Sequence, residues 1–342
     1  MRDLISLTEE EISEYIVSKG LSRFRGKQIH EWLHKKKVAS VDEMTNIPKD
    51  LRAMLNSDFD TYIPKAIECQ ISKIDGTRKY LFELSDHQVV ESVLMKYKHG
   101  NSVCISSQVG CKMGCRFCAS TLDGWLRNLT VGEMLSQVYQ IERDSNERVS
   151  NVVVMGTGEP LDNYDNLVNF VRRLSDKSGL NISQRNITVS TCGLVPRIYD
   201  LAKEDLSITL ALSLHASSQE KREELMPIAK TYEIHDVLKA CDDYFKETGR
   251  RISFEYSLVA GVNDTDEDAR ELHNLIRGMN CHVNLIPVNP IKERDYKQPS
   301  DVAVKAFKEK LERSGINVTI RREMGRDIDG ACGQLRKKYM ER

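Results

Sequence analysis

The sequence has no run of apolar residues long enough to cross a membrane. Its longest apolar stretches, such as 208–214, fall far short of the roughly 20 residues that a transmembrane helix needs. The beginning, MRDLISLTEEEISEY, is acidic and has no apolar segment of the kind found in secretory signal peptides. We therefore expect a cytoplasmic protein that does not interact with a membrane.

The sequence also lacks an excess of charge of one sign. Its 342 residues include 50 Lys+Arg and 51 Asp+Glu, which gives a formal net charge of −1. This balance excludes a uniformly basic nucleic-acid-binding protein, although it leaves room for a local basic face. Internal repeats, low-complexity tracts and long Pro/Gly linkers are absent as well. Any separate modules are therefore expected to pack against one another.

Residues 1–60 predict a helical module. Thr8 and Glu11 have the spacing of a capping box, in which each side chain accepts a hydrogen bond from the backbone of the other residue. The segment 19–37, called the basic segment below, holds seven basic residues and one acidic residue. It is either a solvated helix face, which is the usual meaning of a charge run, or a surface that contacts phosphate groups.

Residues 61–100 predict a small antiparallel β extension, with a turn at Asp75-Gly76. From residue 101 onward, strand-like and helix-like segments alternate, which indicates a parallel sheet with helical crossovers. Six such units are too few for a closed eight-stranded barrel but enough for an open, partial (β/α)6 barrel, so the expected fold class is α/β. The expected strands are 103–106, 151–155, 186–190, 207–213, 251–258 and 282–288, and a short one at 317–321 precedes the tail. Between the strands we expect amphipathic helices, among them 131–143, 166–175, 234–248, 265–279 and 303–314.

Three of the nine cysteines lie within eight residues. Cys111, Cys115 and Cys118 form a C-x3-C-x2-C run just after the first expected parallel strand. Three thiolates on one short loop can face a single point, and both zinc sites and iron–sulfur clusters usually take four ligands. The run therefore fits an iron–sulfur cluster with one iron open to another ligand. It also fits a zinc site that is completed by Cys104 or by a distant residue.

Polar residues follow four successive strands of the expected barrel. Parallel barrels place their chemistry at the carboxyl ends of the strands, so these residues are expected to share one site. A single Ser, His or Asn at a strand end is usually a cap or a turn residue, but four strand ends in succession weaken that interpretation. The residues are Gly158, Glu159, Ser190, Ser213, Leu214, His215 and Asn289.

The cysteine run, with Phe117 inside it, resembles the signature of the radical S-adenosylmethionine (radical SAM) superfamily. Longer strings around Glu91, Cys104, Glu159 and Cys332 resemble one group within it, the RlmN/Cfr family of RNA methyltransferases. This resemblance extends from about residue 90 to the C-terminus. It implies a partial barrel in residues 101–342, and the family also has an N-terminal helical module that would bind RNA.

The resemblance further implies the cofactors and the roles of individual residues. Three cysteines of the run would hold a [4Fe-4S] cluster, and the strand-end residues would bind S-adenosylmethionine. Cys332 would carry the methyl group as S-methylcysteine, and Glu91 would accept a proton from the adenine. Cys104 would then release the product by forming a transient disulfide with Cys332.

The implied substrates are an adenine in the peptidyl-transferase centre of 23S ribosomal RNA and the adenine 3′ of the anticodon in transfer RNAs. An electron donor such as flavodoxin or ferredoxin is implied too, and we expect a monomer. Glu159-Pro160-Leu161 stands where the C8-methylating Cfr branch usually has Glu-Ala-Leu, which favours methylation at C2. A C8 methyltransferase of the Cfr type and a non-catalytic iron–sulfur or zinc RNA-binding protein remain the alternatives.

Overall fold

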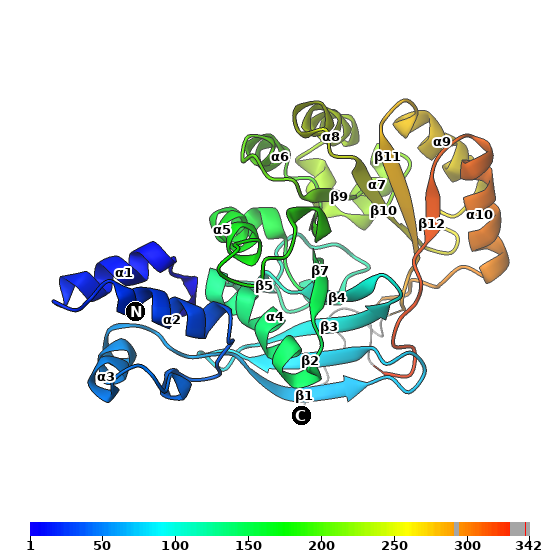
Figure 1. Cartoon of the computed structure of the whole chain (residues 1–342). Helices are drawn as coiled ribbons and strands as arrows, with labels where there is room; N and C mark the ends of the chain where they lie inside the picture. The colour runs from blue at the N-terminus through cyan, green and yellow to red at the C-terminus, as the bar shows by residue number, and fades with distance from the viewer. Residues whose placement is uncertain (291–293, 329–338, 340–342) are drawn as a thin grey trace.

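The computed structural model of the chain describes residues 1–290, 294–328 and 339. Its framework is a ten-stranded sheet with the strand order β1-β2-β3-β4-β7-β8-β9-β10-β11-β12 (Figure 1). Neighbouring strands in this sheet therefore follow one another along the chain. Among the described residues, no helix is both long and apolar enough to cross a membrane.

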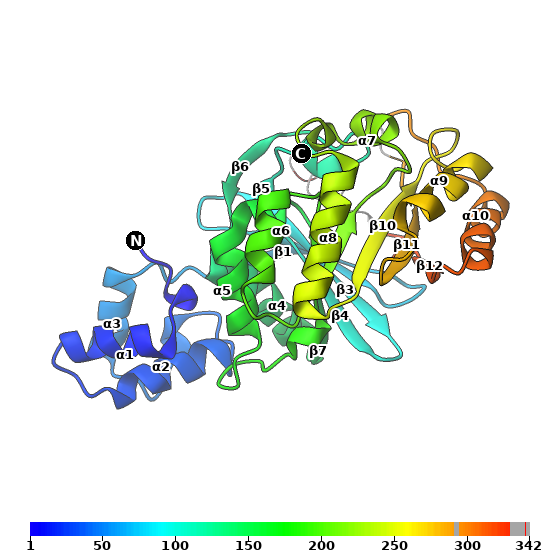
Figure 2. The same cartoon turned by 90° about the horizontal axis from the view of Figure 1, so that it is seen from above.

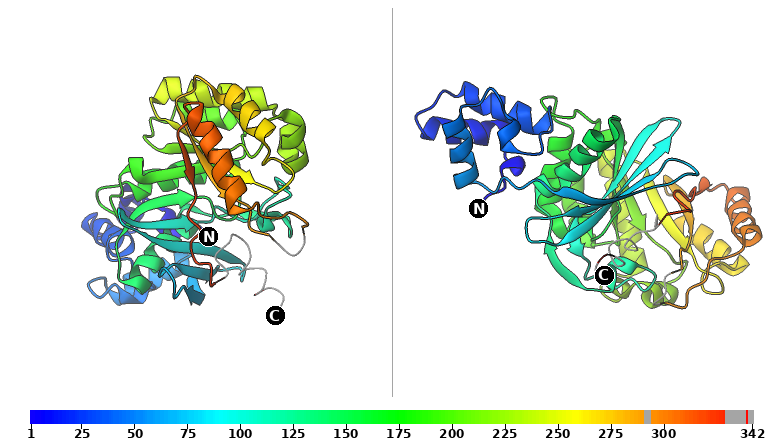
Figure 3. Two further views of the ribbon diagram at one scale, coloured as in Figure 1. Left: turned by 90° about the vertical axis from the view of Figure 1, so that its right-hand side faces the viewer. Right: turned by 90° about the horizontal axis from the view of Figure 1, so that it is seen from below.

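The first 60 residues form helices, as expected from the sequence. They contain α1 (Glu9–Ser18), α2 (Phe24–His34) and α3 (Lys49–Asp58). The capping box at the start of α1 is confirmed, because the Thr8 side chain accepts from Glu11 N–H at 2.7 Å and the Glu11 side chain accepts from Thr8 N–H at 2.8 Å. Figures 2 and 3 show this module at one end of the molecule, opposite the last helix.

The N-terminal module packs on α4 (Val131–Ser145), the first crossover helix. His34 Nδ1 lies 2.8 Å from the hydroxyl group of Tyr139, and Lys37 Nζ lies 2.7 Å from a carboxylate oxygen of Glu142. Burial lowers the pKa of His34 well below its usual value, so the ring stays neutral. One cluster of buried apolar side chains extends from the module into the barrel, so the two are packed together.

The antiparallel extension is continuous with the barrel. Strands β1 (Lys65–Ile71), β2 (Arg78–Glu83) and β3 (Val89–Tyr97) pair antiparallel in succession. Strand β3 then pairs antiparallel with β4 (Gly100–Ile105), which is also the first parallel strand of the barrel. Three antiparallel strands thus enlarge the sheet instead of forming a separate layer.

The partial (β/α)6 barrel predicted from the sequence is confirmed. Strand β4 and the five strands after it all run parallel, and β12 adds a short parallel strand at the edge. In the large sheet, the strands that follow β4 are β7 (Val149–Val154), β8 (Ile187–Thr191), β9 (Thr209–Ser213), β10 (Ile252–Leu258), β11 (Cys281–Pro287) and β12 (Val318–Ile320).

Helices cover the outer side of the barrel strands (Figure 2). The expected helices after α4 are found close to their predicted bounds, whereas α6 and α7 were not predicted. Helix α6 has only eight residues and a proline in its first turn, and α7 has only seven residues, most of them charged or polar. The helices after α4 are α5 (Tyr164–Leu174), α6 (Val195–Ala202), α7 (Gln219–Leu225), α8 (Ile234–Thr248), α9 (Asp266–Ile276) and α10 (Asp301–Arg313).

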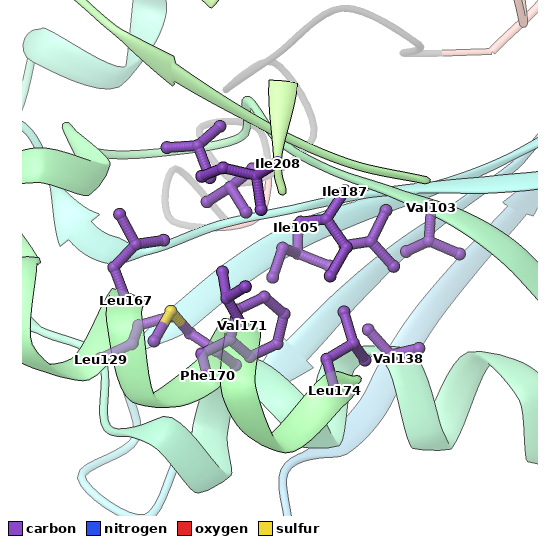
Figure 4. Close-up of a cluster of buried hydrophobic side chains, with 14 of the residues drawn as sticks. Val103, Ile105, Leu129, Val138, Leu167, Phe170, Val171, Leu174, Ile187 and Ile208 are labelled. Carbon is purple, nitrogen blue, oxygen red and sulfur yellow. The ribbon is translucent and has the colours of Figure 1, made fainter. Parts of the chain in front are cut away.

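Apolar packing fixes which face of the sheet is the outer one. Val103 and Ile105 of β4 and Ile187 of β8 point toward Val138 of α4 and Phe170 of α5 (Figure 4). All five side chains are fully buried, and burying each of them contributes roughly 1.5–3 kcal/mol. The register of the strands is therefore strongly determined, because a shift by one residue would turn these side chains away from the helices.

The inner face of the same sheet is polar. Side chains alternate along a strand, so the residues between the buried apolar ones point to the other side of the sheet. Following the pairings from β3 to β12 shows which polar side chains share this inner face. They include Glu91, Cys104, Ser190, Ser213, Glu255, Asn284 and Thr319.

Candidate functional site

The cysteine run lies in the loop that connects the two strands of a second sheet. Strand β5 (Gln108–Gly110) leads directly into Cys111, and the chain returns through β6 (Trp125–Asn128), which pairs antiparallel with β5. Gly110 has a positive φ of 76°, and a Cβ atom there would lie 2.0 Å from the carbonyl oxygen of Gly124. Glycine at this position therefore allows the two ends of the loop to approach each other.

The loop closes one side of a cavity of about 240 Å³ at the carboxyl ends of the parallel strands. This cavity brings together all three cysteines of the run and six of the seven strand-end residues singled out in the sequence. Leu214 is the exception, because its side chain is buried elsewhere and its N–H donates to the carbonyl of Glu255 at 3.0 Å. The lining includes Cys111, Cys115, Cys118, Gly158, Glu159, Ser190, Ser213, His215 and Asn289.

Burial makes the thiols of Cys111 and Cys115 weaker acids than a free cysteine. It raises the pKa of Cys111 to about 12, with the negative charges of Cys118 and Glu159 acting in the same direction. The pKa of Cys115 is raised well above its usual value by burial and then by the other two cysteines. Three thiolates in this place need a positive partner, and metal ions are the usual one.

The spacing of these side chains bears on which metal group they fit. Within the described ranges, no three His, Cys, Asp or Glu side chains lie close enough together to hold one metal ion. The ligands of a single zinc ion all lie about 2–2.3 Å from it. Each cysteine of an iron–sulfur cluster instead binds a different iron, which keeps the sulfur atoms farther apart. Three cysteines that share one short loop and line one cavity fit a cluster of this kind.

Glu159 connects the ends of two neighbouring strands. Its carboxylate accepts hydrogen bonds from Leu161 N–H at 3.1 Å and from Cys192 N–H at 2.8 Å, and its own N–H donates to Gln108 Oε1 at 2.8 Å. Burial raises the pKa of this carboxyl group, and the N–H groups oppose the shift. The side chains of Cys192 and Thr191 also hydrogen-bond to the carboxylate and favour its ionised form.

His215 is held as a neutral ring at the wall of the cavity. Its Nδ1 accepts a hydrogen bond from Ser257 N–H at 2.9 Å, and burial lowers its pKa to about 3, with the charge of Arg222 adding to the effect. The edge of its ring packs against Phe117 of the cysteine loop, with 4.7 Å between ring centroids. The histidine thereby links the loop to β10.

Two charged residues of the cavity were missed in the sequence. Glu255 and Arg321 both line it, on β10 and just after β12. The Glu255 carboxylate accepts from Asn284 Nδ2 at 2.9 Å and from Ser253 Oγ at 3.0 Å. Burial raises the pKa of Glu255, and Arg321 is the strongest group that lowers it. A glutamate between two aromatic residues of a strand was the signal available for finding it.

Glu91 and Cys104 lie near each other on the inner face of the sheet. Val93 pairs with Cys104 across β3 and β4, so Glu91 is the diagonal neighbour of Cys104, which places the β-carbons roughly 7 Å apart. Glu91 is 5% exposed, and its carboxylate lies 3.0 Å from Nζ of Lys79, which is fully buried. Nothing in the sequence distinguished Lys79 from the many solvated lysines.

Cys332 lies outside the described residues. The chain before it is fixed to the turn between β1 and β2. Asp327 accepts from Ser72 Oγ at 2.6 Å, and Gly325 N–H donates to Asp75 at 3.0 Å. Burial opposes the ionisation of Asp75, but hydrogen bonds from Gly325 and Thr77 outweigh it and lower the pKa to about 2.

Two protein-family models match the chain. The model of the radical SAM superfamily matches residues 105–276, and the model of the ribosomal RNA large subunit methyltransferase N-terminal domain matches residues 2–60. The second match covers the helical module, and the first covers most of the barrel.

Curated relatives match over the full length of the chain. A protein of Lachnoclostridium phytofermentans is 62% identical over 340 residues, which cover 99% of this chain and 96% of the relative. A protein of Lachnospira eligens is 60% identical over 341 residues, which cover 100% of this chain and 97% of the relative. Both carry the name probable dual-specificity RNA methyltransferase RlmN.

Solved structures agree with this likeness. The crystal structure of a radical SAM methyltransferase from Sphaerobacter thermophilus is 42% identical and superimposes with a TM-score of 0.94, covering 98% of this chain and 99% of that one. Streptococcus suis SuiB bound to S-adenosylmethionine is 16% identical with a TM-score of 0.51, covers 65% of this chain and 50% of its own, and shares the fold alone. The chain belongs to the RlmN family of radical SAM methyltransferases.

Proposed function

We propose that the chain methylates C2 of an adenine in 23S ribosomal RNA and of the adenine 3′ of the anticodon in transfer RNAs. The observation that carries this proposal is the shared inner face of the sheet. It places Glu91 and Cys104 beside each other and on the same side as the cavity behind the cysteine loop. The names of the relatives support RNA as the substrate class.

Family membership implies a [4Fe-4S] cluster and S-adenosylmethionine. Cys111, Cys115 and Cys118 would hold the cluster, and the strand-end residues around Glu159 and Ser213 would hold the ligand. When bound, this pair of cofactors supplies a carbon-centred radical that can act on an unreactive C–H bond. The buried walls of the cavity keep water away from that chemistry.

The residues of the chain supply a methyl carrier, a base and a resolving thiol. C2 of adenine is electron-poor, so it cannot attack a sulfonium methyl group as an ordinary nucleophile does. Cys332 carries the methyl carbon, which becomes bonded to C2, and Glu91 accepts the proton that leaves C2. The Cys104 thiol then gives up its proton, and its sulfur attacks the Cys332 sulfur, so that a disulfide forms and the bond from sulfur to carbon breaks. The released carbon takes up a proton and becomes the methyl group, and one electron leaves as the methylated RNA is released.

We also infer that the chain works as a monomer in the cytoplasm, where ribosomal RNA is found, and that a small one-electron carrier such as flavodoxin or ferredoxin reduces it. An iron–sulfur site of this kind needs one electron from outside the chain. The inference of a monomer rests on the cavity, whose cysteine loop and strand ends all come from one copy.

The position of methylation is tested by mass spectrometry of modified RNA. Anaerobically reconstituted protein is incubated with unmodified transfer RNA or a 23S fragment, and the RNA is digested to nucleosides. We expect 2-methyladenosine, identified against 2-methyl and 8-methyl standards. A product at C8 would contradict the proposed position, and the absence of any methylated adenosine would contradict the RNA substrate.

The roles of the two mechanistic cysteines are tested in the same assay. Cys104→Ala should accumulate protein joined to RNA through Cys332, because the linkage forms but is not resolved. The adduct should survive reducing agent, unlike a disulfide, and should disappear on nuclease treatment. Cys332→Ala should give no adduct, and Cys281→Ala, a buried cysteine on β11, serves as the control. Normal turnover by Cys104→Ala would contradict the proposed mechanism.

A further inference from the structure

Arg222 is a fully buried guanidinium group that lacks most of its expected partners. It lies on α7 and is 0% exposed. Its Nη2 donates to the carbonyl of Cys192 at 2.6 Å, whereas Nε and Nη1 have no hydrogen-bond partner among the described residues. Buried polar groups are nearly always paired, and an unpaired buried charge is costly. This residue therefore requires an explanation.

The helix that carries the arginine packs against the cysteine loop. The end of α7 binds that loop, because Arg116 N–H donates to the carbonyl of Leu225 at 2.9 Å. The next residue, Met226, packs in one buried cluster with Cys111. Cys192, whose carbonyl accepts from Arg222, lines the same cavity as the three cysteines of the loop. No Asp or Glu is among the groups that act on the guanidinium, whose strongest ionisable neighbours are cysteines.

A cysteine loop that holds a cluster supplies the negatively charged partner that this arginine lacks. Three thiolates bound to an iron–sulfur cluster give the site a net negative charge, and reduction by one electron makes that charge more negative. Charges interact strongly in a buried place, because little water screens them. A fixed cation behind the loop therefore favours the loaded state over the empty one, and the reduced state over the oxidised one.

We propose that Arg222 is the buried counter-charge of the cysteine loop, which promotes cluster loading and raises the reduction potential of the site. Arg222 is fully buried and is not among the residues that line the cavity, so it acts on the site through its charge. The proposal rests on the cluster that the proposed function requires, but it is independent of which adenine is methylated. It also accounts for a charged side chain that the protein buries without a carboxylate partner.

A purely structural role is the competing explanation. The hydrogen bond to Cys192 ties α7 to the end of β8, and a Cβ atom on Gly193 would lie 3.3 Å from Nη2 of Arg222. If this tie were the whole role, its loss would lower the stability of the protein and leave the potential of the cluster unchanged. The two explanations therefore differ in a measurable quantity other than activity.

The test compares three variants of the full chain. Arg222→Met removes the charge and keeps most of the volume, and Arg222→Lys keeps the charge. Arg173→Met is the matched control, because Arg173 on α5 also has a buried Nε without a partner but lies near His34, on the N-terminal module. Each protein is reconstituted anaerobically and assayed for iron. The midpoint potential of the cluster is then measured by a redox titration followed by electron paramagnetic resonance, without RNA.

We expect Arg222→Met to bind less iron and to have a lower midpoint potential than the wild type. Arg222→Lys should stay close to the wild type, and Arg173→Met should not change the potential. An iron-loaded Arg222→Met protein with the wild-type potential would overturn the proposal. A Lys variant whose potential falls as far as that of the Met variant would also overturn it, because the charge would then not be the cause.

If Arg222→Met binds no iron, the stability of this variant without the cluster decides between the two explanations. Loss of iron with unchanged unloaded stability supports the proposal, because removing an unpaired buried charge should not weaken the empty protein. If Arg222→Met does not fold, the Lys variant decides, since a wild-type potential supports the proposal and a lowered potential overturns it. Failure of the cluster assignment itself is distinguishable, because the wild type would then bind no iron.

Discussion

Buried charges gather on the inner face of the sheet and around the cavity. Glu91, Glu159 and Glu255 are each no more than 5% exposed, and Lys79 is fully buried. Taking such groups out of water costs several kcal/mol for each ion, which hydrogen bonds and opposite charges must offset. At the scale of the residue, the protein therefore maintains this polar face at the expense of its stability.

The pair of Lys79 and Glu91 provides a test of that cost. Lys79→Met should lower the free energy of unfolding by about 3–5 kcal/mol, because it leaves a buried carboxylate without its cation. The double variant Lys79→Met/Glu91→Gln should recover most of the loss, since neither charge remains. Urea unfolding of the chain without cofactors measures both.

The matched control for this pair lies at the surface. Lys96→Met removes the cation of the partly exposed pair with Glu147 and should cost less than about 1 kcal/mol. If Lys79→Met and Lys96→Met lost the same free energy of unfolding, the importance given to the pair of Lys79 and Glu91 would be contradicted.

His215 makes the stability of the protein depend on pH. Its pKa is about 3 in the folded chain because of burial and the charge of Arg222, whereas the usual value is about 6.5. The unfolded chain therefore binds more protons at pH values between these two, so this contribution to stability is lost as the pH falls below about 6.5.

The expected size of the effect follows from this difference in pKa. Between about pH 7.5 and about pH 5, His215→Gln should lose roughly 2 kcal/mol less stability than the wild type. Urea unfolding at the two pH values measures the difference, and His235→Gln, at an exposed position, should behave like the wild type. An equal loss in His215→Gln and the wild type would show that the folded ring is not held neutral.

At the scale of the element, the β5–β6 hairpin positions the cysteine loop through close backbone contact. Gly110 and Gly124 both have a positive φ, but a Cβ atom clashes only at Gly110. Gly110→Ala should therefore lose iron binding and much of the stability. Gly124→Ala should cost only about 1 kcal/mol for its strained backbone. Iron content and thermal unfolding measure the two, and similar behaviour of both variants would contradict this account.

The basic segment 19–37 is only partly available to a phosphate backbone. Lys19 pairs with Asp58, Arg23 with Glu10, and Lys37 with Glu142, which joins the module to α4. Arg25 donates to Gln28 and to the carbonyl of Asn46. The cations left for RNA are the exposed Lys27, Lys35 and Lys36, and Lys36 lies over the ring of Trp32 at 3.5 Å.

Charge reversal separates these cations from those that hold the module in place. Lys35→Glu/Lys36→Glu should weaken RNA binding and reduce the slope of log affinity against log salt by roughly 2, because two phosphate contacts are lost. Filter binding at several salt concentrations measures this. Lys203→Glu/Lys305→Glu, two exposed lysines on distant parts of the barrel, is the control. Unchanged RNA affinity would leave the segment as a solvated helix face.

Predictability from the sequence followed the strength of the local pattern. The helix expected at 234–248 is found as Ile234–Thr248, because its apolar period is clear. Helix α7 was missed because it has seven residues and buries only Arg222 and Leu225, which leaves no period to detect. Helix α6 was missed because it has only eight residues, too few for a clear apolar period, and the proline in its first turn fits a helix start well.

The residues of the site also differed in how well the sequence predicted them. The cysteines and the strand-end residues could be found because their grouping follows from spacing along the chain and from parallel topology. Lys79, Arg222 and Glu255 could not, because a charged residue is normally solvated and only the packing of distant elements buries these three. Leu214 is the one strand-end residue that does not line the cavity, because alternation along the chain turns its side chain away from that of Ser213, and its predicted role stays a prediction.

At the scale of the whole molecule, one apolar cluster joins the N-terminal helices to the barrel, and one sheet joins the antiparallel strands to the parallel ones. The division into 1–60, 61–100 and 101–342 stays a prediction, and these contacts bear on whether its parts unfold separately. We expect them to unfold together, because separating them would expose a shared core.

The two tryptophans of the chain can report on this cooperativity. Trp32 lies in the helical module and Trp125 in the hairpin of the cysteine loop. In Trp125→Phe and Trp32→Phe, the fluorescence of the remaining tryptophan should change at the same urea concentration as the circular dichroism of that variant. An earlier transition at Trp32 would show that the module unfolds independently.

The anchor of the tail on the first hairpin has a consequence for the order of folding. The hydrogen bond between Asp327 and Ser72 joins residues 255 positions apart. Contacts of such long sequence separation form late, and a chain folds from its N-terminus as it is synthesised. The cysteine loop and most strands of the barrel are made before residue 327 exists. We therefore expect an interval during biosynthesis in which the cysteine loop and the strands before β12 form a partial cavity, while Arg321 and the segment that runs from β12 to the β1–β2 turn are not yet in place.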